Sequence, residues 1–179
     1  MRRGVCVFIL LLSFAAVSCD RPQAGSTVVL IVRHAEKASD AADSPLTEAG
    51  HQRAQALVRA AEEAGVGAIY STQFRRNLDT ARPVSERLGV AVTQTPIADL
   101  SQPGDYGKVL AGEIVSKHRG RTVLVVSHGN TIAGVIEGLS GRAPALSSVE
   151  YHDLFVVTVP PTGPAGLIKA QYGQRVGGS

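Results

Sequence analysis

The sequence predicts a single α/β domain with helices on both faces of a mainly parallel sheet. Two apolar runs, at residues 28–32 and 122–126, lack the alternation of a half-exposed strand, so each predicts a strand buried on both faces. Segments with the helical spacing of apolar residues alternate with such runs, which is typical of a three-layer α/β/α sandwich. A length of 179 residues and an apolar fraction of 44% suffice for one core of this kind.

The remaining elements follow from turn and helix signals along the chain. Thr47 is placed to cap a helix that Gly65 ends, and a short strand at residues 68–70 follows. Pro83 is expected to break or kink the next helix, over residues 74–88, because proline lacks the N–H of the helical ladder. Further along, the sequence predicts a strand at 90–92, a loop at 93–105, helices at 106–118 and 132–139, and two final strands at 154–159 and 167–172 that could form an antiparallel edge.

The N-terminal residues have the composition of an export signal. Arg2 and Arg3 precede an apolar stretch at residues 5–17, which is too short to span a membrane. The following Ala16-Val17-Ser18-Cys19 resembles a bacterial lipobox with Cys19 as the lipidated residue, and ordinary signal cleavage is the alternative. We therefore expect a signal peptide at 1–18, a polar tether at 19–26 and a domain at 27–179. The expected location is the bacterial periplasm or cell envelope, with a membrane anchor at Cys19.

Cysteine content and charge exclude other classes of protein. Cys6 would leave with the signal, so the mature chain would keep only Cys19 and could form no internal disulfide. The formal charge of +3 falls to +1 once Arg2 and Arg3 are removed, with 16 basic and 15 acidic residues remaining. Only 4% of the residues are aromatic and no basic stripe is present, so nucleic-acid binding is not expected.

Three polar stretches follow predicted strands. The first strand leads into Arg33-His34-Ala35-Glu36, and the strand at 122–126 leads into Ser127-His128-Gly129-Asn130. Between them in the sequence, the strand at 68–70 leads into a stretch at residues 70–81 that contains Arg75, Arg76 and Thr80. Open α/β sheets bind ligands at the carboxyl ends of their strands, so these stretches are expected to meet there. Singly, each could be an ordinary surface or turn residue; together they indicate a functional site.

In their order and spacing these stretches resemble the histidine phosphatase (phosphoglycerate mutase-like) superfamily, especially its small bacterial phosphatases. The resemblance covers the chain from Thr27 to about Leu139 and implies the phosphoglycerate mutase-like fold. It implies that His34 is the nucleophile and that Arg33, Arg76 and His128 bind the phosphoryl group. Arg76 is preferred to Arg75 because the catalytic arginine of the family lies four residues before a threonine, here Thr80.

These residue types suit phosphoryl transfer. Arginine forks match phosphate oxygens, and a neutral imidazole is a nucleophile near pH 7 that can carry the phosphoryl group as a covalent intermediate. A metal site is the rival use of two histidines. Two arginines beside the histidines would repel a divalent cation, and no His pair has ligand spacing, so neither a metal nor another cofactor is expected.

The leaving alcohol needs a proton, and the residue that donates it is the weakest part of the pattern. Many relatives place a carboxyl group in the loop after the third strand, where Asp99 is the nearest match; the alternative is that Asp99 caps its own loop. Glu36 fits the Arg-His-x-Glu motif of the family and is expected to orient the site.

The sequence therefore predicts a metal-independent hydrolase of small phosphomonoesters. The short chain favours a hydrolase over a phosphoglycerate mutase-type enzyme, and an envelope location disfavours a phosphohistidine phosphatase. A non-catalytic lipoprotein that binds an anion or docks a partner is the alternative from another class. The sequence assigns neither the substrate nor the oligomeric state.

Overall fold

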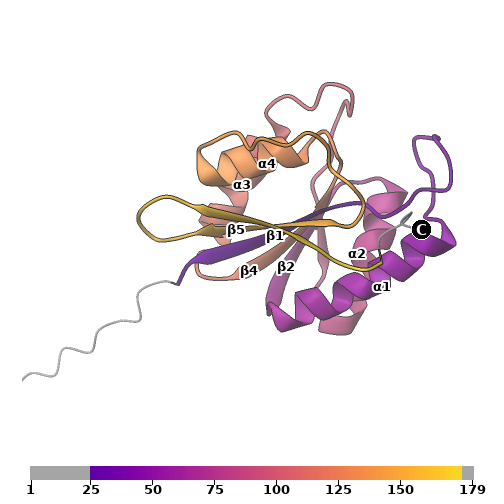
Figure 1. The fold of residues 1–179 in the computed structure, drawn as a ribbon, viewed down its shortest axis with the longest axis horizontal. Coiled ribbons are helices and arrows are strands. Elements are labelled where there is room, and N and C mark those ends of the chain that lie inside the picture. Colours follow the sequence, from indigo (N-terminus) through magenta and orange to yellow (C-terminus); the bar gives the residue numbers. More distant parts are fainter. Residues whose placement is uncertain (1–24, 175–179) are drawn as a thin grey trace, which may run out of the picture.

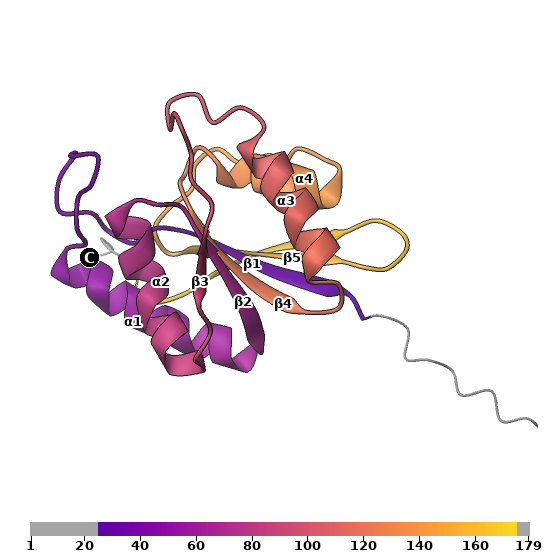
Figure 2. The same ribbon diagram turned by 180° about the vertical axis from the view of Figure 1, so that it is seen from behind.

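A computed structural model describes residues 25–174, which form one six-stranded sheet between two helical layers (Figure 1). The strands are β1 (Thr27–Arg33), β2 (Val66–Ser71), β3 (Val92–Gln94), β4 (Thr122–Ser127), β5 (Asp153–Val159) and β6 (Gly166–Gln171). The helices are α1 (Glu48–Glu63), α2 (Arg75–Leu88), α3 (Tyr106–Lys117) and α4 (Ile132–Ser140). Helices α1 and α2 cover one face of the sheet and α3 and α4 the other (Figures 1 and 2), so the predicted three-layer α/β/α class is confirmed.

The strand order is β3-β2-β4-β1-β5-β6, which places β1 inside the sheet. Strand β1 is parallel to β4 on one side and antiparallel to β5 on the other, and β2 is parallel to both β4 and β3. The last two strands form the antiparallel edge, as the sequence suggested. Because β5 runs opposite to β1, with Val32 beside Leu154, the residues that precede β5 lie at the carboxyl end of β1.

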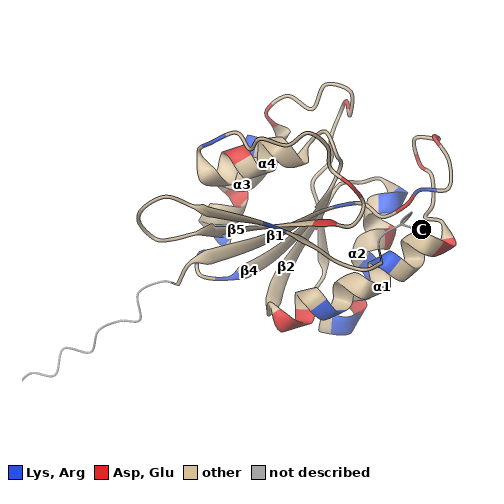
Figure 3. Cartoon of the chain, viewed as in Figure 1, with Lys and Arg blue, Asp and Glu red and all other residues tan. Residues whose placement is uncertain are grey.

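Strand β1 is buried on both faces, as its unbroken apolar run predicted. Val29 and Ile31 pack into the core under α3 and α4, while Leu30 and Val32 pack into the core under α1 and α2. Successive side chains of β1 point to opposite faces of the sheet, and helices cover both faces. Every position from residue 28 to residue 32 is therefore apolar, and the sequence shows no alternation of apolar and polar residues. Charged residues are numerous on the outer surfaces of α1 and α2 and on the loops (Figure 3).

Two predicted elements differ in the structure. Helix α2 continues through Pro83, so the expected break is wrong. Proline removes one backbone hydrogen bond, and the burial of Ala81 and Val84 against the sheet holds the helix across it. Strand β3 begins at Val92 rather than at residue 90, because the amide of Val90 still donates to the carbonyl of Ser85 in the turn that closes α2 (3.2 Å).

The predicted signal peptide and Cys19 lie outside the described residues. From residue 25 to residue 174, no helix combines the length and apolar character that a membrane span requires.

Candidate active site

Four of the predicted site residues line one pocket of about 420 Å³ at the carboxyl edge of the sheet. Arg33 ends β1 and His34 follows it, His128 directly follows β4, and Arg76 lies in the first turn of α2. Arg33 lies beside Ser127 in the parallel pairing of β1 and β4, which brings the two histidine-bearing strand ends together. The rest of the lining consists of Lys37, Leu100, Gly129, Asn130, Ser148, Val149 and Glu150.

His34 is held as a neutral imidazole with one nitrogen free for reaction. Its Nδ1 lies 2.8 Å from the carbonyl oxygen of Ala35, which can only accept, so Nδ1 carries the proton and Nε2 keeps its lone pair. The side chain is buried. Burial, opposed by the hydrogen bond to Ala35 and reinforced by the charge of Arg76, lowers the pKa of His34 from 6.5 to about 4.

His128 is the second buried imidazole of the pocket. Its Nε2 forms a 2.9 Å hydrogen bond with the hydroxyl of Thr72, and its ring lies 5.4 Å from that of His34, centroid to centroid. Burial is the main cause that lowers the pKa of His128 to about 3, and the nearby His34 and Arg76 add to it. Both histidines are therefore neutral at pH 7 in the unliganded site.

The two arginines each keep a buried donor unused. Arg33 donates from Nη1 to the carbonyl of Val149 (3.0 Å) and stacks over the ring of Tyr151 at 4.2 Å. Arg76 donates from Nη1 to the carbonyl of Ala42. The Nε atoms of both arginines are buried without a hydrogen-bond partner among the residues described. Because both side chains line the pocket, an oxyanion bound there would satisfy these donors.

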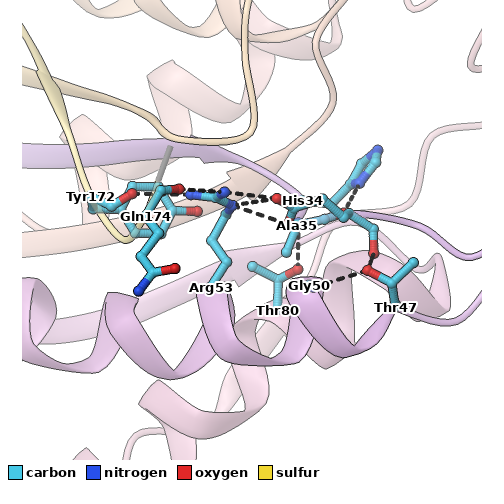
Figure 4. Close-up of polar contacts among 9 residues, drawn as sticks. His34, Ala35, Thr47, Gly50, Arg53, Thr80, Tyr172 and Gln174 are labelled. Atoms are coloured by element: carbon cyan, nitrogen blue, oxygen red, sulfur yellow. Dashed lines mark hydrogen bonds and ion pairs between the residues drawn. The ribbon is translucent and has the colours of Figure 1, made fainter. Parts of the chain in front are cut away.

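The backbone after His34 is fixed by α1 and α2 (Figure 4). The amide of Ala35 donates to the hydroxyl of Thr80 (2.9 Å), and this hydroxyl donates in turn to the carbonyl of Arg76 (2.7 Å). The carbonyl of Glu36 accepts from the amide of Thr47 (2.8 Å). One threonine therefore links the loop after His34 to the backbone of Arg76.

Glu36 lies outside the pocket lining and forms a buried ion pair instead (Figure 4). Its carboxylate accepts three hydrogen bonds of 2.7 to 3.0 Å from the guanidinium of Arg53 on α1. Arg53 also donates to the backbone carbonyls of Tyr172 (3.1 Å) and Gln174 (2.8 Å) beyond β6. The carboxylate is thus unavailable as an acid, and its position supports the predicted orienting role.

Sequence comparison agrees with this geometry. Residues 29–99 match the model of the histidine phosphatase superfamily (branch 1), and the matched segment contains Arg33, His34 and Arg76. This segment of the chain is therefore similar to the histidine phosphatase superfamily. A search of curated protein sequences found no significant match.

Solved structures with a similar fold include phosphatases. Mycobacterial glucosyl-3-phosphoglycerate phosphatase has a TM-score of 0.64 at 18% identity, over 74% of this chain and 90% of that one. It has also been solved with inorganic phosphate. The protein histidine phosphatase SixA, complexed with tungstate, has a TM-score of 0.59 at 20% identity, over 80% and 96% of the two chains. These TM-scores establish a shared phosphoglycerate mutase-like fold. At identities this low, the similarity extends to the fold alone.

Asp99 is not among the residues that line the pocket with His34 and His128. Its exposed carboxylate accepts from the amide (2.8 Å) and the hydroxyl (2.7 Å) of Ser101, and the hydroxyl bond is the main cause that lowers the pKa of Asp99. It borders a neighbouring, mostly apolar cavity of about 380 Å³. From the same loop, Leu100 lines the site, and its carbonyl accepts from Asn130 (2.7 Å). The geometry is that of the loop cap, the alternative to an acid.

Two backbone amides at the start of α4 are not free to bind an anion. The amides of Thr131 and Ile132 both donate to the carbonyl of His128, at 3.0 and 3.2 Å, so they are engaged within the turn. Gly129 and Asn130 are the residues of this turn that line the pocket.

Sequence reasoning missed Thr72 and the segment from Ser148 to Tyr151. The hydroxyl of Tyr151 accepts from Nη2 of Arg33 (3.4 Å), and its ring centroid lies 5.9 Å from that of His34. The signal that could have found this segment is the direction of β5, since residues before an antiparallel strand reach the carboxyl end of its parallel neighbours. Between residues 25 and 174, no group of three or more His, Cys, Asp or Glu is placed to hold a metal ion.

Proposed function

We propose that this protein hydrolyses small phosphomonoesters through a covalent phosphohistidine on His34, without a metal ion. One observation carries the proposal: a buried, neutral imidazole with a free Nε2 shares its pocket with two arginines that each have an unused, buried Nε–H. These groups match the needs of a phosphoryl group in transfer, which spreads negative charge over three oxygens and requires an in-line nucleophile.

In the first step, Arg33 and Arg76 bind the phosphoryl oxygens, and Nε2 of His34 attacks phosphorus. The new N–P bond forms as the bond to the leaving oxygen breaks. The imidazole gains positive charge, which the hydrogen bond from Nδ1–H to the carbonyl of Ala35 stabilises. In the second step water attacks phosphorus, the N–P bond breaks and its electron pair returns to Nε2. Phosphate leaves and the neutral histidine is restored.

The proposed absence of a metal requirement rests on charge. Two guanidinium groups beside the imidazoles, that of the buried Arg76 and that of the half-buried Arg33, supply the positive charge that a metal ion supplies in other phosphatases. The same groups repel a divalent cation from the pocket. The ions and substrates named for the structural neighbours, inorganic phosphate and a phosphorylated glyceric acid derivative, support a small phosphorylated substrate here.

The proposal includes export to the bacterial envelope and a lipid anchor at Cys19. Its support is the basic, apolar and lipobox-like order of residues 1–19. Incorporation of a labelled fatty acid into the full chain, and its loss in Cys19→Ala, is the expected result. Equal labelling of both proteins, or none, contradicts the anchor.

The test of the activity uses the chain from Asp20 onward with p-nitrophenyl phosphate in EDTA. We expect turnover together with an acid-labile phosphoenzyme, and His34→Ala should abolish both. Arg76→Lys should lower kcat/KM by about 100-fold, because it removes the fork that stabilises the transferring group. Arg75→Lys is the matched control: this neighbouring side chain is exposed and is not part of the pocket lining, so little change is expected.

Absence of turnover and of a trapped phosphohistidine, across several phosphomonoesters and pH values, contradicts the enzyme. That result would favour a non-catalytic protein that binds anions. Isomerisation that depends on a bisphosphate primer would instead indicate a mutase.

A further inference from the structure

A proton donor for the leaving alcohol is missing from the residues assigned so far. Both pocket histidines have low pKa values and are neutral at pH 7, with the proton of His34 bound by Ala35. Arginines do not release protons in this range. Asp99 is engaged by Ser101 and does not line the pocket. An alkyl phosphate nevertheless needs an acid, because an alkoxide is a poor leaving group.

We propose that Glu150 is this acid, an inference that rests on the proposed phosphatase function. Glu150 is the one carboxylate side chain among the pocket-lining residues of the described chain. The acid would thus come from the segment before β5 rather than from the loop after β3. Lys37 also lines the pocket and could donate a proton, but its ammonium group is paired with Asp40 at 2.7 Å.

The backbone at Glu150 is held at the peptide group before it and at its own carbonyl, which accepts from the amide of Asp153 at 3.2 Å. Before it, the carbonyl of Val149 accepts from Nη1 of Arg33 at 3.0 Å. At Glu150 itself, the amide donates to Oδ2 of Asp153 at 2.8 Å, and this buried carboxylate also pairs with Lys169 at 2.9 Å. One arginine therefore holds both the expected phosphoryl site and the chain that carries the acid. Only the side-chain torsions of Glu150 remain to place its carboxyl group.

The carboxylate of Glu150 is also unpaired among the described residues. The residue is exposed, and within residues 25–174 its carboxylate forms no hydrogen bond or ion pair. Asp99 differs in this respect, since two donors of Ser101 occupy its carboxylate. A bound phosphoryl anion favours the protonated form of a neighbouring carboxyl group, which is the form that an acid requires.

The proton then follows a balanced cycle. As Nε2 of His34 attacks phosphorus, the leaving oxygen takes the proton of the Glu150 carboxyl group and departs as the alcohol. The resulting carboxylate accepts a proton from the water that attacks phosphohistidine. Phosphate is released, the electron pair of the N–P bond returns to Nε2, and Glu150 is again protonated.

Leaving-group dependence tests this role with the purified protein. We compare Glu150→Gln with the matched variant Asp99→Asn on p-nitrophenyl phosphate, which has a good leaving group, and on phenyl and alkyl phosphates. Glu150→Gln should lower kcat/KM by about 100-fold or more on alkyl phosphates and only a few-fold on p-nitrophenyl phosphate. Asp99→Asn should match the wild-type protein on all of these substrates.

Two further readouts separate the acid from a structural residue. Glu150→Gln should lose the fall in alkyl phosphatase activity towards alkaline pH that deprotonation of an acid produces. It should also accumulate phosphoenzyme from p-nitrophenyl phosphate, because the attacking water loses its base. Equal thermal unfolding temperatures for Glu150→Gln and the wild type show that the fold is retained, as expected for an exposed side chain.

Equal losses on all substrates, or no loss on any, would overturn the assignment. A selective loss in Asp99→Asn would move the acid to the loop after β3. Wild-type protein that hydrolyses aryl but not alkyl phosphates would show that no acid acts. These results differ from failure of the proposed function, in which wild-type protein forms no phosphoenzyme with p-nitrophenyl phosphate.

Discussion

At the scale of the residue, burial and one hydrogen bond give His34 the protonation state and tautomer that the proposed nucleophilic attack requires. An exposed histidine would be partly protonated near neutral pH, and the cation is not a nucleophile. Here burial disfavours the cation, and the carbonyl of Ala35 selects the tautomer with a free Nε2. His128 is also buried, with its ring centroid 5.4 Å from that of His34, and it is neutral for the same reason. The neutral pair lets a phosphate bind to arginines without a competing change in protonation.

The lowered pKa values predict acid-sensitive stability. His34 and His128 have pKa values of about 4 and 3 in the folded protein, against 6.5 when exposed, so the unfolded chain binds more protons between pH 4 and 6.5. Their contribution is present above pH 6.5 and is lost as the pH falls through this range. His128→Gln should therefore reduce the loss of unfolding free energy between pH 7 and 4.5, by about 2 kcal/mol.

Urea unfolding at the two pH values measures this difference. His51→Gln is the control, because His51 is exposed on α1 and its variant should keep the wild-type loss. An equal loss in His128→Gln and the wild-type protein would show that His128 does not contribute to the acid sensitivity.

At the scale of the element, the loop after β1 is positioned by the close approach of α1. Thr47 caps this helix by accepting from the amide of Gly50 (3.0 Å), and its own amide donates to the carbonyl of Glu36. A Cβ at Gly50 would lie 2.4 Å from that same carbonyl oxygen. Glycine is therefore required where the helix meets the backbone two residues beyond the nucleophile.

Gly50→Ala should destabilise the protein and reduce its activity together. The new methyl group must displace backbone rather than a flexible side chain, which costs about 1–3 kcal/mol. The displacement moves the segment that carries His34, so kcat on p-nitrophenyl phosphate should fall. Gly67→Ala is the control, since nothing lies within 4 Å of a Cβ at that position and its φ is not positive. A Gly50→Ala protein with wild-type stability and kcat would contradict this role of the helix contact.

At the scale of the whole molecule, one buried ion pair joins segments from opposite ends of the described chain. Arg53 binds Glu36 beside the site and the carbonyls of Tyr172 and Gln174 beyond β6. These contacts satisfy both charges, whereas an unpaired buried charge is strongly unfavourable. The end of the sheet and the loop of the nucleophile are therefore held by the same guanidinium group.

The stability losses from removing the two partners of this ion pair should not be additive. Glu36→Gln leaves the buried charge of Arg53 without its partner and should lower the free energy of unfolding by about 3 kcal/mol. Glu36→Gln combined with Arg53→Met should lose less than the sum of the single variants, because neither buried charge remains. Urea unfolding of the double-mutant cycle measures the coupling, and additive losses would contradict the proposed pairing.

The sequence by itself determined the fold class and the four residues that meet at the pocket. Apolar runs without alternation require a sheet covered on both faces, and the carboxyl ends of parallel strands share one edge, so Arg33, His34 and His128 converge for local reasons. Tertiary structure alone decided the continuation of α2 through Pro83, the pairing of Arg53 with Glu36, and which acidic residue lines the pocket. Asp99 and Glu150 are both polar loop residues in the sequence. The antiparallel direction of β5 brings the segment of Glu150 to the pocket, while Asp99 is engaged by its own loop. Strand direction and long-range pairing are properties that no local sequence pattern encodes.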